Sequence, residues 1–312
     1  MIFSELLVWV PLASYPAACL AGVLAAVTAS LAVVHTRGST AMPAALWAVA
    51  ACGGLSLESG LRAAGGLNDP AASAGVRLAV GAMMLCPAMS LLGAKRPQHR
   101  VWQLIVASLW MVLLMPALSA RLARPGSLPD VHLLERGFLL VLALVGWMNF
   151  IGTRRGLAAT LITAGQLAWL WPFLPGVSTA AAIPQPVVDC VGAWLIALPA
   201  VISAAQSNAR PRLVQKQLSE SRPASIAILV NRPFLALRET LGAAWTLRIA
   251  ERFDTLATAH GWPCRLRFGG LEVSGNPTDA SWHPDALRAI KSLFHRFVTD
   301  DWLARHGWPS AK

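Results

Sequence analysis

The chain has 312 residues, of which 55% are hydrophobic and only 13% are charged, about half the charged share of an average soluble domain. Together with a mean hydropathy of +0.54, this composition excludes an ordinary water-soluble globule and indicates an integral membrane protein. The net charge of +11 at pH 7 fits a cytosolic surface held against anionic lipid, so we expect no nucleic-acid partner.

The charged residues divide the chain into two parts. Residues 1–207 contain 11 Lys/Arg and 6 Asp/Glu, whereas the shorter segment 208–312 contains 15 and 9. We therefore predict an α-helical transmembrane bundle over residues 17–207, followed by a small cytosolic α+β domain over residues 208–312. Residues 1–16 carry aromatic side chains but lack the basic start of a secretory signal, and we interpret them as an interfacial lead-in.

Apolar runs of about membrane-spanning length recur along the bundle. The predicted spans cover residues 17–34, 42–57, 76–92, 101–118, 137–151, 157–174 and 187–205. A span needs about 20 apolar residues, and the second and fifth runs are short. The prediction is therefore seven spans, with six as the alternative.

Basic residues are enriched in alternate turns between these spans, while Arg62, Arg77, Arg121, Arg124 and Arg136 fall on the opposite side. The turns after the first, third and fifth spans hold Arg37; Lys95, Arg96 and Arg100; and Arg154 and Arg155. Because Lys and Arg concentrate on the cytoplasmic side, this bias predicts a bacterial inner-membrane protein with its N-terminus outside and its C-terminus in the cytosol. The side chains that we expect to contact anionic lipid are those of Lys95, Arg96, Arg100, Arg154 and Arg155.

The segment 208–312 shows the periodicities of amphipathic helices and a hairpin. Apolar residues three and four positions apart predict one helix over residues 233–259. Alternating residues predict a short hairpin within 264–273, and Pro284 is typical of the start of a second helix. A tetrapeptide that we interpret as a helix stop, His-Gly-Trp-Pro, occurs at residues 260–263 and 306–309.

Four segments of the chain contain recognisable short motifs. They are Leu92–Gln98, Trp102-Gln103, Ser108–Trp110 and, in the C-terminal part, Trp245–Pro263. These segments resemble a family of uncharacterised bacterial polytopic membrane proteins. The resemblance covers most of the chain and implies a membrane protein, and it supplies no activity, substrate or catalytic residue.

Ionisable residues inside apolar runs are costly, and they therefore mark candidates for function. The candidates are Glu58, Arg62, Arg77 and Asp189, which the predicted topology places at the outer ends of their spans. Glu58 and Arg62 are four residues apart and can pair on one helix face. We interpret the four as an outer polar cluster that joins helix ends, with an outward-facing binding site as the alternative.

Motifs for catalysis and metal binding are absent from the sequence. It contains no G-x-S-x-G, H-E-x-x-H, G-x-G-x-x-G or P-loop, and its five cysteines show no C-x-x-C or Cys/His spacing. We predict no catalytic residue, metal or cofactor. The expected role is a non-catalytic scaffold, assembly or signalling protein whose basic C-terminal domain contacts a protein partner or the inner leaflet. The alternatives are a small-solute transporter or channel that uses the outer polar cluster, and a membrane enzyme that acts on lipid.

Overall fold

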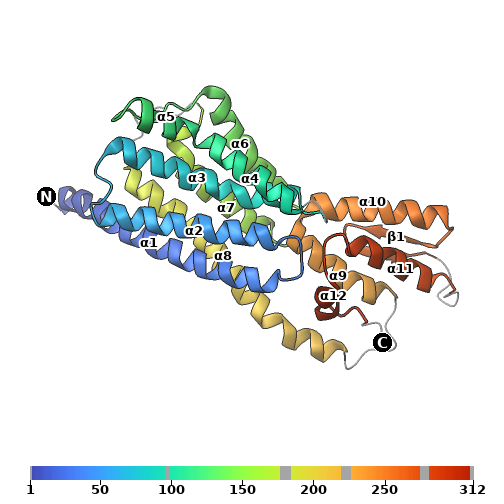
Figure 1. The fold of residues 1–312 in the computed structure, drawn as a ribbon. Helices are drawn as coiled ribbons and strands as arrows, with labels where there is room; N and C mark the ends of the chain where they lie inside the picture. The colour runs from blue at the N-terminus through green and yellow to red at the C-terminus, as the bar shows by residue number, and fades with distance from the viewer. Residues whose placement is uncertain (1, 96–98, 176–183, 219–225, 275–280, 310–312) are drawn as a thin grey trace.

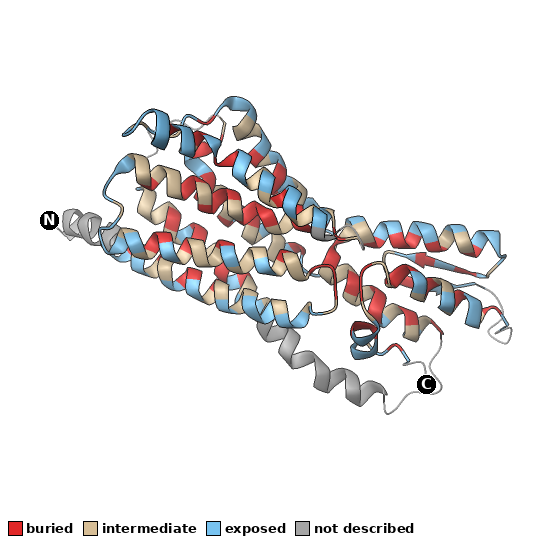
Figure 2. Ribbon diagram, viewed as in Figure 1, coloured by how far each residue is buried: buried red, intermediate tan, exposed pale blue. Residues whose placement is uncertain are grey.

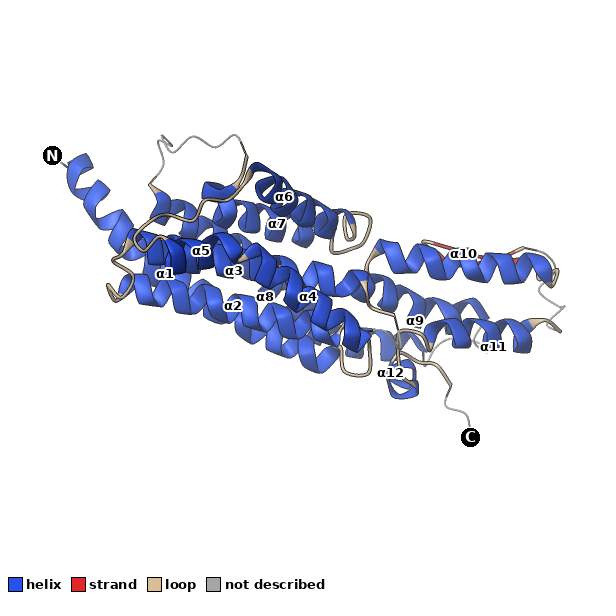
Figure 3. Ribbon diagram, turned by 45° about the horizontal axis from the view of Figure 1, so that its top comes forward, coloured by secondary structure: helices blue, strands red, loops and turns tan. Residues whose placement is uncertain are grey.

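The computed structural model describes residues 2–95, 99–175, 184–218, 226–274 and 281–309, with the backbone alone at 2–12, 99–100 and 204–218. These residues form a helical bundle that is followed along its long axis by a C-terminal domain (Figures 1 and 3). The bundle consists of α1 (Ile2–His35), α2 (Met42–Ala63), α3 (Pro70–Leu92), α4 (His99–Leu113), α5 (Met115–Ala123), α6 (Leu133–Met148), α7 (Gly156–Leu170), the 3-10 turn η1 (Trp171–Phe173) and α8 (Gln185–Leu218). The C-terminal domain contains α9 (Ile226–Leu241), α10 (Ala243–Ala259), β1 (Cys264–Arg267), β2 (Gly270–Val273), α11 (His283–Phe294) and α12 (Asp300–Arg305).

The helix α3 lies at the centre of the bundle (Figure 2). In its apolar segment 61% of the residues are buried, compared with 22% in α1. Leu78 and Leu85 belong to a core shared with α4, α6 and α7. Val80 and Met84 belong to a second core shared with α1, α2, α7 and α8. The bundle is therefore built as two packed cores on either side of one helix.

Proline residues set two of the helix boundaries. The carboxylate of Asp69 accepts hydrogen bonds from the amides of Ala71 and Ala72, at 3.2 and 3.1 Å, so it caps the start of α3. Pro70 follows at the first helical position, where its missing amide needs no partner. The fourth predicted span is bent by 47° between α4 and α5, because Pro116 cannot donate the hydrogen bond that would continue the helix.

Helix length and composition support four or five of the seven predicted spans. Within the described residues, four helices are long and apolar enough to cross a membrane, and the bent pair α4–α5 makes a fifth. The helices α6 and α7 have 16 and 15 residues, which is shorter than the length of about 20 residues that crosses a hydrocarbon core. The predicted domain boundary at residue 207 lies inside α8.

The C-terminal domain packs its helices and hairpin around a core that includes Phe234, Phe253 and Phe294 and that extends to Ala41, Ala44, Leu91 and Ala94 of the bundle. The predicted hairpin is confirmed, since β1 and β2 pair antiparallel with Cys264 opposite Val273. The predicted helix stops are also confirmed, because α10 and α12 each end immediately before a copy of His-Gly-Trp-Pro. The second stop implies a helix before it, but the start of the six-residue α12 was not predicted, because this helix is too short to show a period.

The single helix predicted over residues 233–259 is wrong, because the chain breaks at Gly242. This residue has φ +82° and ψ −173°, a backbone conformation that is essentially restricted to glycine. A Cβ at this position would collide with Asn149 of the bundle. The apolar stripe continues across the break, so periodicity alone predicted one helix where the structure has α9 and α10.

Candidate functional site

One end of the bundle, which carries the turns after α1, α3 and α6, is attached to the C-terminal domain (Figure 1). We call it the domain-side end, and we call the opposite end the far end. In the turn after α1, the amide of Thr40 donates to the carbonyl of Phe297 at 2.8 Å. The amide of Thr299 donates to the carbonyl of Gly38 at the same distance. These bonds form a short antiparallel bridge between the two parts of the chain.

The turns after α3 and α6 make further bonds to α10. The indole nitrogen of Trp245 donates to the carbonyl of Leu91 at 2.7 Å. The carbonyl of Asn149 accepts from the amide of Ala243 at 2.7 Å, and its side-chain oxygen accepts from the amide of Ala244 at 3.1 Å. Asn149 thereby binds two of the amides that the first turn of α10 leaves unpaired. All three domain-side turns thus hold the C-terminal domain.

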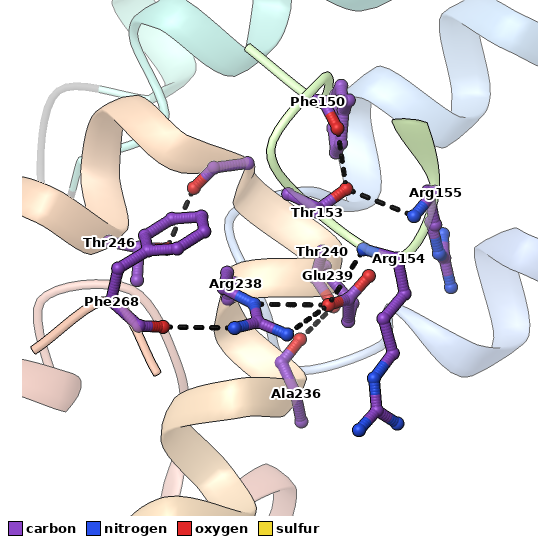
Figure 4. A network of polar contacts seen from close by, with 11 residues as sticks. Phe150, Thr153, Arg154, Arg155, Ala236, Arg238, Glu239, Thr240, Thr246 and Phe268 are labelled. Atoms are coloured by element: carbon purple, nitrogen blue, oxygen red, sulfur yellow. Dashed lines mark hydrogen bonds and ion pairs between the residues drawn. The ribbon is translucent and has the colours of Figure 1, made fainter. Parts of the chain in front are cut away.

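A polar network joins the turn after α6 to α9 and the hairpin (Figure 4). One carboxylate oxygen of Glu239 accepts from the guanidinium of Arg238 at 2.9 and 3.1 Å, and it lies 3.5 Å from the backbone amide of Arg154. Arg238 also donates to the carbonyl of Phe268 at 2.9 Å. The side chains of Arg154 and Arg155 extend away from Glu239 and are exposed. These two predicted lipid contacts therefore lie on the surface of the domain-side end.

A pocket of about 290 Å³ lies where the turn after α3 meets α10 and the end of α11. We call it the junction pocket. Four of its lining side chains are cationic, namely Lys95, Arg248, Arg252 and Arg296. Among the described residues, the lining contains no carboxylate and none of the four cations forms a salt bridge. The remaining predicted lipid contacts, the side chains of Arg96 and Arg100, lie outside the described residues.

Two tryptophans form apolar walls of the junction pocket. The indole nitrogen of Trp102 donates to the carbonyl of Met89 at 2.8 Å, and its ring lies against Gly93, where a Cβ would collide with it. On the other wall, the guanidinium carbon of Arg248 lies 5.3 Å from the centre of the Trp245 ring. Guanidinium groups bind phosphate and carboxylate oxygens in pairs of parallel hydrogen bonds. The arrangement is therefore able to bind an anion.

The outer polar cluster is brought together at the far end. Arg77 on α3 makes two hydrogen bonds to the carboxylate of Asp189 on α8, and the one between Nη1 and Oδ2 measures 2.7 Å. The Nε of Arg77 also donates to the carbonyl of Trp169 at 3.0 Å, and Gln185 donates to Asp189 at 2.8 Å. Arg77 is 3% exposed and Asp189 is 1% exposed. This buried pair ties α3 to α7 and α8.

The other two cluster residues pair along α2. The guanidinium of Arg62 lies 2.5 Å from one carboxylate oxygen of Glu58 and also lies over the Tyr15 ring, 5.7 Å from its centre. The second carboxylate oxygen of Glu58 is buried and has no hydrogen-bond partner among the described residues. Each cation of the cluster is therefore matched by a carboxylate, and the cluster joins helices of both bundle cores.

Sequence reasoning missed several residues of both sites. Arg248 and Arg252 lie four residues apart on α10, and this spacing places them on one helix face. Nothing in that spacing indicates that the face meets Lys95 from the turn after α3. At the far end, the neutral residues Gln185 and Trp169 give no sequence signal, because such side chains are common in apolar helices.

The described residues define a helical protein with four or five apolar helices of membrane-spanning length, a buried charge cluster at one end and a cationic pocket at the other. Comparison of the chain with protein-family models, curated proteins and solved structures found no match.

Proposed function

We propose that this chain is a multi-pass protein of the bacterial inner membrane, of non-catalytic scaffold, assembly or signalling type. Its C-terminal domain lies in the cytosol, contacts the anionic inner leaflet and presents its surface to a protein partner. The four or five apolar helices support the membrane part of this proposal, because each is long enough to cross a hydrocarbon core of about 30 Å.

One observation carries the proposal, namely that the basic turns and the C-terminal domain share one end of the bundle. Arg37, Lys95 and Arg154 each lie in a turn in which that residue or a nearby one hydrogen-bonds to that domain. The segment 208–312 itself carries 15 Lys/Arg and 9 Asp/Glu. Positive residues concentrate on the cytoplasmic side, so the shared end is assigned to the cytosol.

The same arrangement supports seven passages of the chain through the membrane. Because the turns after α1, α3 and α6 and the end of α8 share the domain-side end, each intervening pair of helices leaves that end and returns to it. The short α7 is extended by η1, and α4 and α5 together make one bent passage. Seven passages put the N-terminus outside and the C-terminal domain inside.

Within this proposal the outer polar cluster has a structural role. Arg77 and Asp189 pair between α3 and α8, and Glu58 and Arg62 pair on α2. A solute that entered here would have to replace these internal partners, and each buried charge left alone carries a large desolvation cost. This pairing therefore favours a structural role, in which the cluster holds helix ends together, over a transport site.

Cysteine labelling tests the topology. In a variant whose five native cysteines are replaced by alanine, we would introduce either Asn68→Cys in the far-end turn after α2 or Ser274→Cys in the C-terminal domain. Both positions are exposed. A membrane-impermeant maleimide is expected to label Asn68→Cys in intact spheroplasts, and Ser274→Cys only after permeabilisation. The reverse pattern, or recovery of the protein in the soluble fraction, contradicts the proposal.

A further inference from the structure

We propose that the junction pocket is a binding site for a phosphate group, and that its ligand is the headgroup of an anionic phospholipid. A soluble phosphate compound offers the same chemistry, and the experiment below separates the two sources. The lipid source rests on the proposed function, because it requires the domain-side end to lie at the inner leaflet.

The charge of the pocket is the first argument. Lys95, Arg248, Arg252 and Arg296 come from three separate elements and converge on one cavity of about 290 Å³. Like charges that are gathered in this way repel one another, and none of the four is compensated by a carboxylate in the described residues. An anion with several oxygens relieves this repulsion, and arginine is the side chain best suited to phosphate.

The second argument is that the pocket is fixed before any ligand binds. Trp102 is held by its bond to Met89 and by its close packing on Gly93. Trp245 is held by its bond to Leu91, and its ring supports the Arg248 guanidinium. The Arg248 guanidinium is thus already held, so it loses little conformational freedom on binding and more of its electrostatic attraction is retained as affinity.

The third argument identifies the lipid as the source. The helix α4, which contributes Trp102 to the pocket, exposes Val101, Leu104 and Ile105 by 64%, 69% and 48% in its first two turns. Leu92, which lines the pocket itself, is 41% exposed. The cationic pocket is thus continuous with an apolar helix face. A phospholipid matches both, with its phosphate in the pocket and its acyl chains along α4.

The consequence is a ligand that bridges the two parts of the protein. Lys95 and Trp102 belong to the bundle, whereas Arg248, Arg252 and Arg296 belong to the C-terminal domain. A ligand that binds only when these groups are together stabilises the docked arrangement. The attachment of the C-terminal domain would then depend on the lipid composition of the inner leaflet.

The test uses the full chain in nanodiscs of phosphatidylcholine, with and without phosphatidylglycerol, and it measures both Tm and retained phosphatidylglycerol. The pocket variant is Arg248→Gln/Arg252→Gln. The matched control, Arg265→Gln/Arg267→Gln, removes the same charge from exposed positions of the hairpin in the same domain. A second pocket variant, Lys95→Gln/Arg296→Gln, removes the same charge through different elements, in case the first does not fold.

We expect phosphatidylglycerol to raise the Tm of the wild-type protein and of the control. At about 1 kcal/mol for each cation and a factor of ten for each 1.4 kcal/mol, the pocket variants are expected to bind the lipid roughly 30-fold more weakly. Stabilisation by glycerol 3-phosphate in pure phosphatidylcholine nanodiscs, lost in the same variants, would support the phosphate site with a soluble source. Equal responses of pocket variants and control, or no response of the wild-type protein to either probe, would overturn the proposal.

This outcome is independent of the labelling experiment. Failure of the topology would show in the cysteine accessibility at positions 68 and 274, whereas failure of the phosphate site would show only in the difference between pocket variants and control. A domain found outside the cytosol that still binds glycerol 3-phosphate through these arginines would retain the site and remove its lipid source.

Discussion

The indole nitrogen of Trp245 donates a hydrogen bond of 2.7 Å to the main-chain carbonyl of Leu91, and this bond joins the C-terminal domain to the central helix of the bundle. Leu91 is 8% exposed, so its carbonyl has little access to water. The Trp245 ring also packs on Phe297, with 5.2 Å between the ring centres. One side chain therefore links α10 to α3 and to the segment after α11.

The variant Trp245→Phe keeps an aromatic ring and removes the hydrogen bond. The buried carbonyl of Leu91 then loses one of its partners and keeps the amide of Ala94 at 3.1 Å, so we expect the free energy of unfolding to fall by roughly 0.5–1.5 kcal/mol. Thermal unfolding in detergent measures this loss. Trp262→Phe is the control, since that indole packs on Phe253 within the domain. An equal loss in both variants would argue against a specific role for the bond to Leu91.

Gly242 is expected to be intolerant of any side chain. Gly242→Ala would place a methyl group against Asn149 as well as forcing alanine to adopt φ +82°. Gly261→Ala has a similar positive φ of +67°, with no atom within 4 Å of the added Cβ. We expect the backbone conformation to cost roughly 1–3 kcal/mol in either variant, and Gly242→Ala to lose more stability than Gly261→Ala. Limited proteolysis should also cleave near α10 sooner in Gly242→Ala, and similar behaviour of the two would contradict the close approach.

Substitutions in the pair of Arg77 and Asp189 are expected to lower the stability of the protein mainly when only one partner is removed. Arg77→Met alone leaves the Asp189 carboxylate buried without its counter-ion, and we expect a loss of about 3–5 kcal/mol in unfolding free energy. The double variant Arg77→Met/Asp189→Leu should recover much of that loss. The exposed pair of Arg267 and Glu272 serves as the control, with about 0–1 kcal/mol expected on removing either partner. Additive losses at Arg77 and Asp189 would contradict a coupled pair.

Acidification is expected to destabilise the C-terminal domain through His306. Burial lowers the pKa of this histidine from its ordinary value of 6.5, while its Nδ1 lies 2.7 Å from the carbonyl of Trp302. Between the lowered pKa and 6.5 the unfolded chain binds more protons than the folded one, so stability is lost as the pH falls below neutrality. Measurements of Tm against pH should show a shallower decline for His306→Gln than for the wild-type protein. His260→Gln, at the exposed equivalent position in the other His-Gly-Trp-Pro, should leave the decline unchanged.

The helices of the bundle could be predicted because lipid-length apolar runs leave a strong signal, and α3 ends at Leu92 as predicted. The bend at Pro116 and the break at Gly242 were missed, because hydropathy and periodicity do not record backbone conformation. Both residues belong to the types that interrupt helices, and both lie within continuous apolar patterns. Whether such a residue bends or breaks a helix depends on how the neighbouring helices pack against it.

The two candidate sites differ in how far sequence could define them. The four residues of the outer polar cluster were named because ionisable side chains are rare in apolar runs, and the structure places them in two pairs at the far end. Of the residues that line the junction pocket, only Lys95 was predicted as a site residue. Arg248 and Arg252 join the pocket through the docking of α10, in which Trp245 bonds to Leu91, a residue 154 positions away in the chain. Local patterns cannot report a contact over such a separation.

The bridge between Gly38–Thr40 and Phe297–Thr299 also imposes an order on assembly. The backbone groups of the turn after α1 find their partners in a segment that is synthesised after the whole bundle. Until that segment emerges, the carbonyl of Gly38 and the amide of Thr40 have only water to bind. The turn between α1 and α2 is thus completed only after the other bundle helices have been synthesised, so a chain truncated before Phe297 would leave this turn open.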